Sequence, residues 1–395
     1  MGRLSLNTKS FYPLLVVGGG IGGLTTALAL ARKGFPVHLI EREAEFGEIG
    51  AGIQLAPNAS KVLDRLGVLA EISKYVVYPE GIVWMDAVSG KHITTLDLGE
   101  NFVKNYRYRY FVMHRSDLLT CLLQACQQNP LITLETSRPV VRVEDLGDAA
   151  RVTCANGEIY ETEALVAADG LHSVVRAQLI DDSAPVCSEF VAYRGAIPIE
   201  EISNHAGLNN VFYWVGPDMH LVQYPVRRGE LYNQVAVFKS KRYRPGSDDW
   251  GTVDELEEKF SQACEGVRTG LVKIKRNRRW PLFDRLPADN WTRNRVTLIG
   301  DAAHPMLQYI AQGACQALED AMCLADKMEE FGGDIPKTFA AYQAERFPRT
   351  ARVQTSARQF GEIAHIDGMG LILRNAYFAG RVSDDFTYTD WLYGY

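Results

Sequence analysis

A glycine-rich loop that directly follows a short apolar strand constrains the fold of this chain more than any other feature. The apolar run at 14–17 leads into Gly18, Gly20 and Gly23, which form a G-x-G-x-x-G pattern. In such a loop the first glycine permits a tight turn, the second lets the backbone approach a pyrophosphate, and the third allows close packing of helix on strand. The N-terminus of the helix that follows supplies N–H groups and partial positive charge for phosphate.

The residues after the loop complete a β-α-β unit. A helical stretch at 24–33 is followed by a second strand at 37–40, which ends at Glu41 and Arg42. Such units build parallel sheets. Glu41 lies 18 residues after Gly23 (41 − 23), where a carboxylate can bind an adenosine ribose hydroxyl. The unit predicts dinucleotide binding, with a coincidental glycine turn as the alternative, and by itself it does not distinguish FAD from NAD.

Two further motifs stand at strand ends. Asp169 and Gly170 follow an apolar strand at 164–168, and Gly300 and Asp301 also follow a strand. Taken alone, the Asp-Gly pair is typical of a turn, and the Gly-Asp pair is equally typical of a turn that caps a helix. The Asp301 carboxylate is expected at the carboxyl end of a parallel sheet, where ligands bind in such folds.

Together these segments, in this order and spacing, resemble the single-component flavoprotein aromatic hydroxylases of group A, over nearly the whole chain. The resemblance implies that the loop from Gly18 to Gly23 holds the FAD diphosphate and that Asp169 faces FAD and the pyridine nucleotide. It also implies that Gly300 and Asp301 contact the ribityl chain. Arg115 matches a flavin-contacting arginine of the family.

A long helix is predicted at 315–331. Gly313 and Ala314 precede it, and we expect their backbone N–H groups to lie near the flavin pyrimidine ring. Glu319 and Asp320 fall one turn into the helix, and they are expected to be a surface pair rather than catalytic groups.

The resemblance also implies a reaction cycle. NAD(P)H reduces FAD, O2 adds to give a C4a-hydroperoxyflavin, and its terminal oxygen attacks the aromatic ring. The family likeness assigns His220 and Gln308 to the substrate hydroxyl and Tyr224 to the orientation of the ring. His220 is our expected base, because an imidazole titrates near neutral pH. Side chains at even separations on a strand share a face, so His220, Val222 and Tyr224 should align, with Gln223 opposite. The alternatives are a core histidine and a surface glutamine.

Within the family, several segments resemble the branch that converts 3-hydroxybenzoate to gentisate by para hydroxylation. These segments are 46–52, 192–195, 220–225, 233–238, 304–309 and 388–392. Salicylate hydroxylases share the first two. A salicylate 1-hydroxylase-like or heteroaromatic acid hydroxylase therefore stays open, as does a catalytically silent flavin- or ligand-binding protein. No arginine is an obvious clamp for the substrate carboxylate; Arg194 is a candidate, and a structural role at a sheet edge is the alternative.

Composition excludes several other classes. The 395 residues carry a formal net charge of −6, which argues against sequence-independent binding of nucleic acid. The one basic run, at 273–279, is interpreted as a solvated face, with attraction of a nucleotide phosphate as the alternative. No later run approaches 18 apolar residues, so no membrane span is expected.

The seven cysteines are scattered, and none forms a C-x-x-C pair. Neither a zinc site nor a redox dithiol is indicated, no metal is expected, and reduced thiols favour a cytoplasmic protein. Cys121, Cys126, Cys315 and Cys323 lie in apolar stretches and are expected to be buried. A homodimer is common in the family that the chain resembles.

The predicted fold class is α/β: a Rossmann-type FAD-binding domain with an inserted strand-rich substrate domain and C-terminal helices. The FAD-binding domain is expected in three parts, at 1–77, 101–187 and 285–365. The substrate domain is expected to comprise 78–100 and 188–284, and an aromatic tail to cover 366–395.

Overall fold

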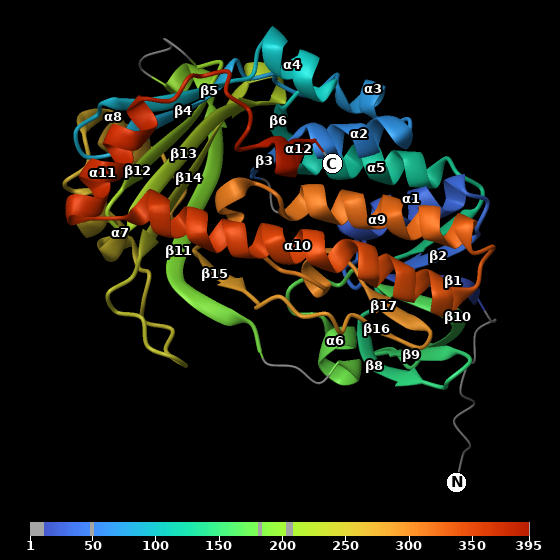
Figure 1. Cartoon of the computed structure of the whole chain (residues 1–395). Helices are drawn as coiled ribbons and strands as arrows, with labels where there is room; N and C mark the ends of the chain where they lie inside the picture. The colour runs from blue at the N-terminus through green and yellow to red at the C-terminus, as the bar shows by residue number, and fades with distance from the viewer. Residues whose placement is uncertain (1–11, 48–50, 181–183, 203–207, 395) are drawn as a thin grey trace.

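The β-α-β unit lies at the centre of the first sheet in the computed structural model of the chain, which describes residues 12–47, 51–180, 184–202 and 208–394 (Figure 1). The strands of this sheet are β1 (Tyr12–Val17), β2 (Val37–Ile40), β7 (Ile132–Glu135), β8 (Val140–Asp145), β9 (Ala150–Cys154), β10 (Ile159–Ala167), β16 (Thr292–Arg293) and β17 (Val296–Leu298). Their order is β16-β17-β10-β1-β2-β7, with β8 and β9 continuing from β10. The pairs β17-β10, β10-β1, β1-β2 and β2-β7 are parallel, so their carboxyl ends meet at one edge.

Several helices pack on or beside this sheet. α1 (Ile21–Arg32), α5 (Arg115–Gln127) and α6 (Val174–Leu179) contact its strands, and α9 (Gly313–Glu330) packs on α1. Farther out, α2 (Pro57–Arg65) packs on α9, α3 (Leu69–Ile72) packs on α2 and α5, and α4 (Glu100–Tyr106) bonds the C-terminal tail. α1 is apolar on nearly all sides because it packs between α5 and α9 as well as next to the sheet. A short two-stranded sheet pairs β3 (Gly52–Leu55) with β6 (Phe111–His114).

The second sheet joins segments that are far apart in the sequence. Its strands are β4 (Gly81–Asp86), β5 (His92–Asp97), β11 (Val186–Pro198), β12 (Val211–Gly216), β13 (Met219–Val226), β14 (Leu231–Lys239) and β15 (Trp280–Asp284). Their order is β15-β11-β14-β13-β12-β4-β5, and every pairing is antiparallel except β12 with β4. Helices α7 (Val253–Phe260) and α8 (Glu265–Val272) bury apolar side chains against one face of the sheet.

The helix α10 (Ile335–His365) connects the two sheets. Its 31 residues run across the front of the molecule in Figure 1, from the first sheet to the second. It packs on α9 and contacts both β12 and β13. Two shorter helices, α11 (Gly368–Ala379) and α12 (Asp390–Tyr393), follow it, so the aromatic tail is largely folded onto the protein.

Glu319 and Asp320 are not a surface pair, and that prediction is wrong. They are 4% and 0% exposed, because α9 lies between α1 and α10 and turns these carboxylates towards α10. The Asp320 carboxylate accepts hydrogen bonds from Arg346 Nε (2.7 Å) and from the backbone N–H of Gly300 (2.9 Å), and it lies 2.6 Å from His304 Nε2. Glu319 accepts from Arg346 Nη1 at 2.6 Å.

The pKa of Asp320 reflects this environment. Burial alone would raise the pKa, but His304 and Arg346 outweigh burial and lower it to about 2. The pKa of Asp320 in the folded protein therefore lies below its value in the unfolded chain. Its ionised carboxylate stabilises the fold fully at pH values above the unfolded-state pKa. This contribution is lost as the pH falls towards 2.

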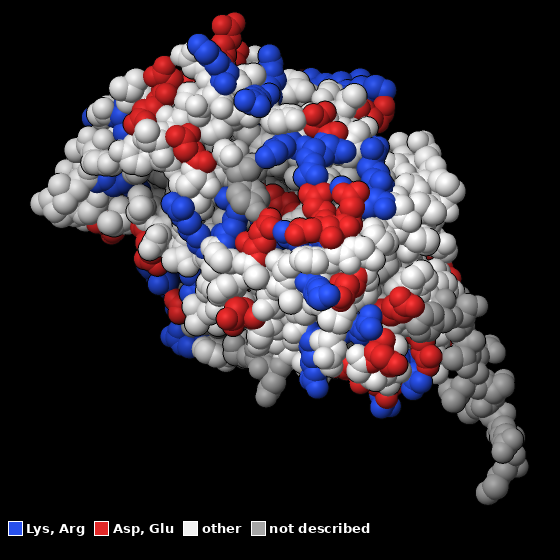
Figure 2. Space-filling model, turned by 45° about the vertical axis from the view of Figure 1, so that its right-hand side comes forward, with Lys and Arg blue, Asp and Glu red and all other residues white. Residues whose placement is uncertain are grey.

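The sequence predictions about the cysteines and the basic run can be compared with the structure. Cys121, Cys126, Cys315 and Cys323 are buried, as predicted. In the basic run, Lys273 and Arg276 are exposed and pair with Glu201 and Glu257, which favours the solvated interpretation. On the face drawn in Figure 2, described acidic and basic side chains lie next to one another rather than in separate zones. Within the described ranges, no helix is both long and apolar enough to cross a membrane.

Replacement of Arg346 by Leu should lower the free energy of unfolding by about 3–5 kcal/mol, because it leaves the buried Asp320 carboxylate without its guanidinium partner and Glu319 with Arg349 alone. Chemical denaturation followed by tryptophan fluorescence would measure the loss. Arg65→Leu is the matched control, since Arg65 also pairs with an α9 carboxylate, Asp326, but at the surface, and should cost less than about 1 kcal/mol. Equal free energies of unfolding for the two variants would contradict the role of Arg346 as a stabilising buried cation.

Candidate active site

Two hollows meet at the carboxyl edge of the first sheet. The first, of about 560 Å³, runs along the glycine loop and the ends of the parallel strands. The second, of about 460 Å³, lies on the second sheet and is bounded on its other sides by β3, the turn at Asp301 and the C-terminal tail. Arg115, Asp301, Gly313 and Ala314 line both hollows, so these four residues mark their junction. Both volumes are within the range of ligand pockets.

The glycine loop is closely packed where its pattern requires glycine. Gly18 has φ +106°, a conformation that favours glycine, and an added Cβ would overlap the carbonyl oxygen of Ala168. A Cβ at Gly23 would overlap the carbonyl oxygen of Gly18. Gly20 has no neighbour within 4 Å of such an atom, so its backbone is open to the first hollow.

Glu41 and Arg42 lie at the rim of the same hollow. The Glu41 carboxylate accepts hydrogen bonds from the N–H groups of Gly19 (2.5 Å) and Glu43 (2.9 Å). Glu41 is therefore held directly against the glycine loop. Arg42 is exposed, and its Nε donates to Glu43 at 3.1 Å.

Asp169 does more than end a strand. Its Oδ2 accepts from the N–H groups of Val174 (2.8 Å) and Val175 (3.3 Å), which open α6. Its Oδ1 is buried and has no hydrogen-bond partner among the described residues. Burial raises the pKa of Asp169, and the bonds from the helix oppose that rise. The structure thus presents one unsatisfied carboxylate oxygen at the hollow that Asp169 lines.

The Gly-Asp motif forms the 3₁₀ turn η3 (Gly300–Ala302). Gly300 has φ +55°, and its N–H is held by Asp320. Arg176 of α6 donates to the carbonyl oxygens of Ala302 (2.9 Å) and Ala303 (2.6 Å), which links this turn to the Asp169 segment. Protein atoms around the Asp301 carboxylate raise its pKa, and the charge of Arg115 opposes that rise.

The helix α9 begins at Gly313, two residues earlier than predicted. Gly313 and Ala314 therefore form its first turn, where N–H groups have no partner within the helix. The beginning of this 18-residue helix lies at the junction of the two hollows. The backbone donors expected at these positions are present.

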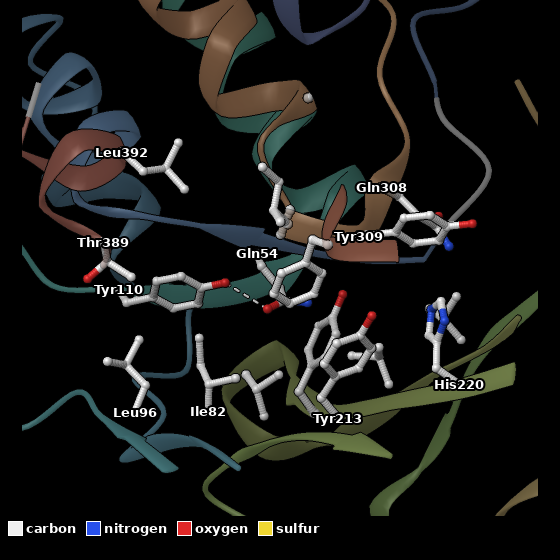
Figure 3. Close-up of a pocket in the computed structure, with 18 of the residues that line it drawn as sticks. Gln54, Ile82, Leu96, Tyr110, Tyr213, His220, Gln308, Tyr309, Thr389 and Leu392 are labelled. Atoms are coloured by element: carbon white, nitrogen blue, oxygen red, sulfur yellow. Dashed lines mark hydrogen bonds between the residues drawn. The ribbon is translucent and has the colours of Figure 1, made fainter. Parts of the chain in front are cut away.

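The second hollow contains the side chains predicted on one face of β13. His220, Val222 and Tyr224 line it, whereas Gln223 accepts a hydrogen bond from Trp214 Nε1 at 3.0 Å and does not line it. The predicted alternation is confirmed. Gln308, in the turn η4 (Gln308–Ile310), lines the same hollow, and Figure 3 shows it on the side towards which His220 points.

The expectation that His220 titrates near neutral pH is wrong. His220 is 1% exposed, and burial together with the neighbouring His365 lowers its pKa well below the ordinary value. The physical reason is that a positive charge is poorly solvated there. The imidazole is neutral near pH 7 and can accept a hydrogen bond.

The sequence did not identify several residues of this hollow. Tyr110 donates to Gln54 Oε1 at 2.7 Å, as Figure 3 shows, and the buried Tyr213 hydroxyl has no hydrogen-bond partner among the described residues. The tail also contributes Tyr388, Thr389, Trp391, Leu392 and Tyr393. Its density of aromatic residues was visible in the sequence, but no local pattern indicated where it packs.

Specific bonds hold the tail over the hollow. The Tyr106 hydroxyl donates to Asp390 Oδ1 at 2.7 Å. Arg349 donates to the carbonyl oxygens of Trp391 (2.8 Å) and Leu392 (2.7 Å). Because Arg349 also bonds Glu319, the tail is connected to the buried network between α9 and α10.

The charges that line the second hollow are mainly positive. They come from Arg115, Arg194 and Arg381, against the single carboxylate of Asp301 among the described lining residues. Arg194 lies on β11, where it pairs with Val235 of β14, whereas the pairing of β11 with β15 ends at Ala192. Arg194 therefore lines the hollow beside a locally open edge of the strand, and the structural alternative stays open. Its guanidinium lies 4.6 Å from the centre of the Trp280 ring. This lining suits an anionic aromatic ligand.

The two hollows together fit a dinucleotide with an extended ring system. The glycine loop leaves backbone open at Gly20, Asp169 has an unsatisfied oxygen, and α9 begins at the junction. A phosphate group is favoured at such a helix and loop arrangement.

Comparisons with known proteins agree with this geometry. Residues 12–357 match the family model described as FAD binding domain. A 3-hydroxybenzoate 6-hydroxylase from Polaromonas naphthalenivorans (strain CJ2) is 39% identical over 384 residues, which are 97% of this chain and 96% of that protein. The solved structure of a salicylate hydroxylase substrate complex matches with TM-score 0.81 and 26% identity, over 98% of this chain and 96% of that one. Klebsiella pneumoniae HpxO complexed with FAD and uric acid matches with TM-score 0.83 and 24% identity, over 94% of each chain, and shows the same fold.

Alanine substitutions at Gly23 and Gly20 should have different effects. Gly23→Ala should reduce soluble yield and melting temperature, because its Cβ overlaps backbone that cannot move away. Gly20→Ala should fold normally and retain less FAD, because only the approach of the diphosphate is obstructed. Thermal unfolding and the flavin-to-protein absorbance ratio after desalting would measure both. Wild-type stability and flavin content in Gly23→Ala would contradict this account of the loop.

Proposed function

The chain belongs to the FAD-binding domain family and is a flavin-dependent aromatic monooxygenase, and we propose that it converts 3-hydroxybenzoate to gentisate. The observation that supports this substrate most directly is a cavity with His220 and Gln308 on one side and a mainly cationic lining. The name of the relative that is 39% identical supports the same choice.

We propose that the residues around the first hollow hold FAD. The glycines at 18, 20 and 23 would cradle the diphosphate, with Glu41 and Arg42 at the adenosine end. Asp169, Gly300 and Asp301 would lie along the ribityl side, and Arg115, Gly313 and Ala314 beside the ring system at the junction. When bound and reduced by NAD(P)H, FAD supplies the activation of O2.

The chain itself positions and activates the substrate. His220 Nε2 would accept the proton of the phenolic hydroxyl, and Gln308 would hold the same oxygen. Loss of that proton raises the electron density of the ring at the para position, where the new oxygen enters. Tyr224 would orient the substrate. Its ring packs closely against Gly52, since a Cβ at Gly52 would lie 2.5 Å from a ring carbon of Tyr224.

The enclosure of the cavity adds to this chemistry. The tail covers one side with Trp391, Leu392 and Tyr393, and the second sheet forms the floor. Exclusion of water protects reactive oxygen species from side reactions and strengthens electrostatic interactions in the site. The arginines of the lining would favour the carboxylate of the substrate, although no single one of them is assigned to it.

A salicylate-type reaction is the second candidate, supported by the structural likeness to a salicylate hydroxylase. That reaction releases CO2 and gives catechol, so the product distinguishes the two.

We also propose a cytoplasmic homodimer and the domain boundaries given by the sequence. The grouping of strands 81–97 with strands 186–284 in one sheet supports those boundaries.

The purified protein should be yellow, and 3-hydroxybenzoate should stimulate its oxidation of NADH or NADPH. The expected product is gentisate, identified by chromatography against standards of gentisate and catechol. Salicylate, 4-hydroxybenzoate and 6-hydroxynicotinate serve as competing substrates. Catechol from salicylate as the main product would overturn the proposed substrate and leave the monooxygenase assignment intact.

Replacement of His220 by Ala should lower the rate of gentisate formation at least about 100-fold, because it removes the acceptor of the phenolic proton. FAD content should not change, since His220 lines only the second hollow. Gln223→Ala is the control on the same strand, because Gln223 faces away from the cavity, and should keep most of the activity. A His220→Ala enzyme as fast as Gln223→Ala would refute this role.

A further inference from the structure

His365, the last residue of α10, lies directly behind His220. His220 Nδ1 and His365 Nε2 are 2.6 Å apart, and the two rings are nearly parallel, with 12° between their planes. On its other side His365 stacks on Phe190, with ring centroids 4.5 Å apart. Tyr309 packs edge-on against both imidazoles. The contact is therefore held from several elements of the fold.

The two histidines have different surroundings. His220 lines the cavity and is 1% exposed, whereas His365 is not among the cavity-lining residues and is 8% exposed. His365 ends α10, and the next residues, Ile366 and Asp367, are exposed. The pair thus extends from the cavity to the end of α10, where the chain reaches the surface.

Neither imidazole can keep an additional proton. Burial and the neighbouring His365 lower the pKa of His220. Burial, Arg374 and Lys259 lower the pKa of His365 to about 3. The titratable and charged groups around the pair are Tyr213 of β12, Tyr309 of η4, Lys259 of α7, Arg374 of α11, and Asp218, which pairs with Lys259 and whose N–H donates to the His365 carbonyl oxygen.

Two neutral imidazoles in contact must have one donor and one acceptor nitrogen. If His220 donates from Nδ1, its Nε2 carries a lone pair towards the cavity, as a base for a phenol requires. His365 Nε2 is then the acceptor, and His365 carries its own proton on Nδ1. The opposite arrangement would leave an N–H in the cavity and no base.

We propose that His365 is a positioning residue that sets the tautomer of His220 and passes the substrate proton to solvent. In this step the phenolic O–H bond breaks and an N–H bond forms at His220 Nε2. The Nδ1–H bond of His220 breaks as one forms at Nε2 of His365, which releases its Nδ1 proton to water. The net change is transfer of one proton from the substrate hydroxyl to solvent, with no change in oxidation state. It leaves both imidazoles neutral with their protons on Nε2, and the reverse transfer, from water through His365 and His220 to the phenolate oxygen of the product, restores the starting tautomers. The inference rests on the proposed function, in which a phenol binds at His220.

This arrangement separates rate from equilibrium. Because both histidines return to the neutral state, the fraction of bound substrate that is phenolate depends on the pKa of the bound phenol and on the pH. His365 affects only how fast that fraction is reached. A residue with a merely structural role would instead change FAD content, stability or substrate affinity.

The first test uses His365→Gln, whose amide oxygen can accept a hydrogen bond from Nδ1–H of His220 but cannot take up the proton and pass it on. Stopped-flow absorbance of bound 3-hydroxybenzoate in the oxidised holoenzyme should show phenolate formation slowed about 10–100-fold, with an unchanged final amplitude across the pH range. Added imidazole should restore part of the rate. Phe190→Leu is the matched control, because it removes the ring stacked on His365 and keeps the nitrogen; its rate should stay within about twofold of wild type. Equal slowing in both variants, or none in His365→Gln, would overturn the relay.

The second test needs no substrate. Nitrogen NMR of the wild-type FAD-loaded protein with labelled histidine should show His220 protonated at Nδ1 and bare at Nε2, with assignment by His220→Ala and His365→Gln. A His220 protonated at Nε2 would overturn the inference whatever the substrate is. If wild type binds no 3-hydroxybenzoate, the proposed function fails, and the tautomer alone decides the proposal about His365.

Discussion

The buried pairing of Asp320 with Arg346 is the interaction on which the rest of the site depends. One carboxylate binds the Arg346 guanidinium, the N–H of Gly300 and the His304 ring, and so joins α9, α10 and the η3 turn. Such a pair is stable in an apolar interior only when every polar atom has a partner, and here the partners come from three separate segments. The position of Asp301 at the junction of the hollows follows from it.

The same network extends in both directions from that turn. Arg176 binds the carbonyl oxygens that follow Asp301 and thereby connects the turn to α6, which the Asp169 carboxylate caps. Arg349 binds Glu319 and the carbonyl oxygens of Trp391 and Leu392, which holds the tail over the cavity. Cofactor side and substrate side are therefore parts of one hydrogen-bonded unit.

Burial changes the chemistry of the residues that the sequence made prominent. The alternation of β13 was enough to predict that His220 and Tyr224 share a face, since the period of a strand is local. It could not predict that the pKa of His220 lies well below its ordinary value, because the burial and the neighbouring His365 that lower it come from packing. Glu319 and Asp320 were misplaced for the same reason: their charge favours a surface, and only the arginines of α10 make burial possible.

The sequence by itself determined the features that depend on short segments: the glycine loop, the β-α-β unit, the strand-end motifs at Asp169 and Asp301, and a family likeness that includes FAD. Only the tertiary structure decided which distant groups meet. The contact of His365 with His220, the tail over the cavity and the Arg346 network join residues that are 26 to 145 positions apart. Side-chain partners at such separations are selected by packing and by the need to satisfy buried polar atoms, and neither of these is encoded in local periodicity.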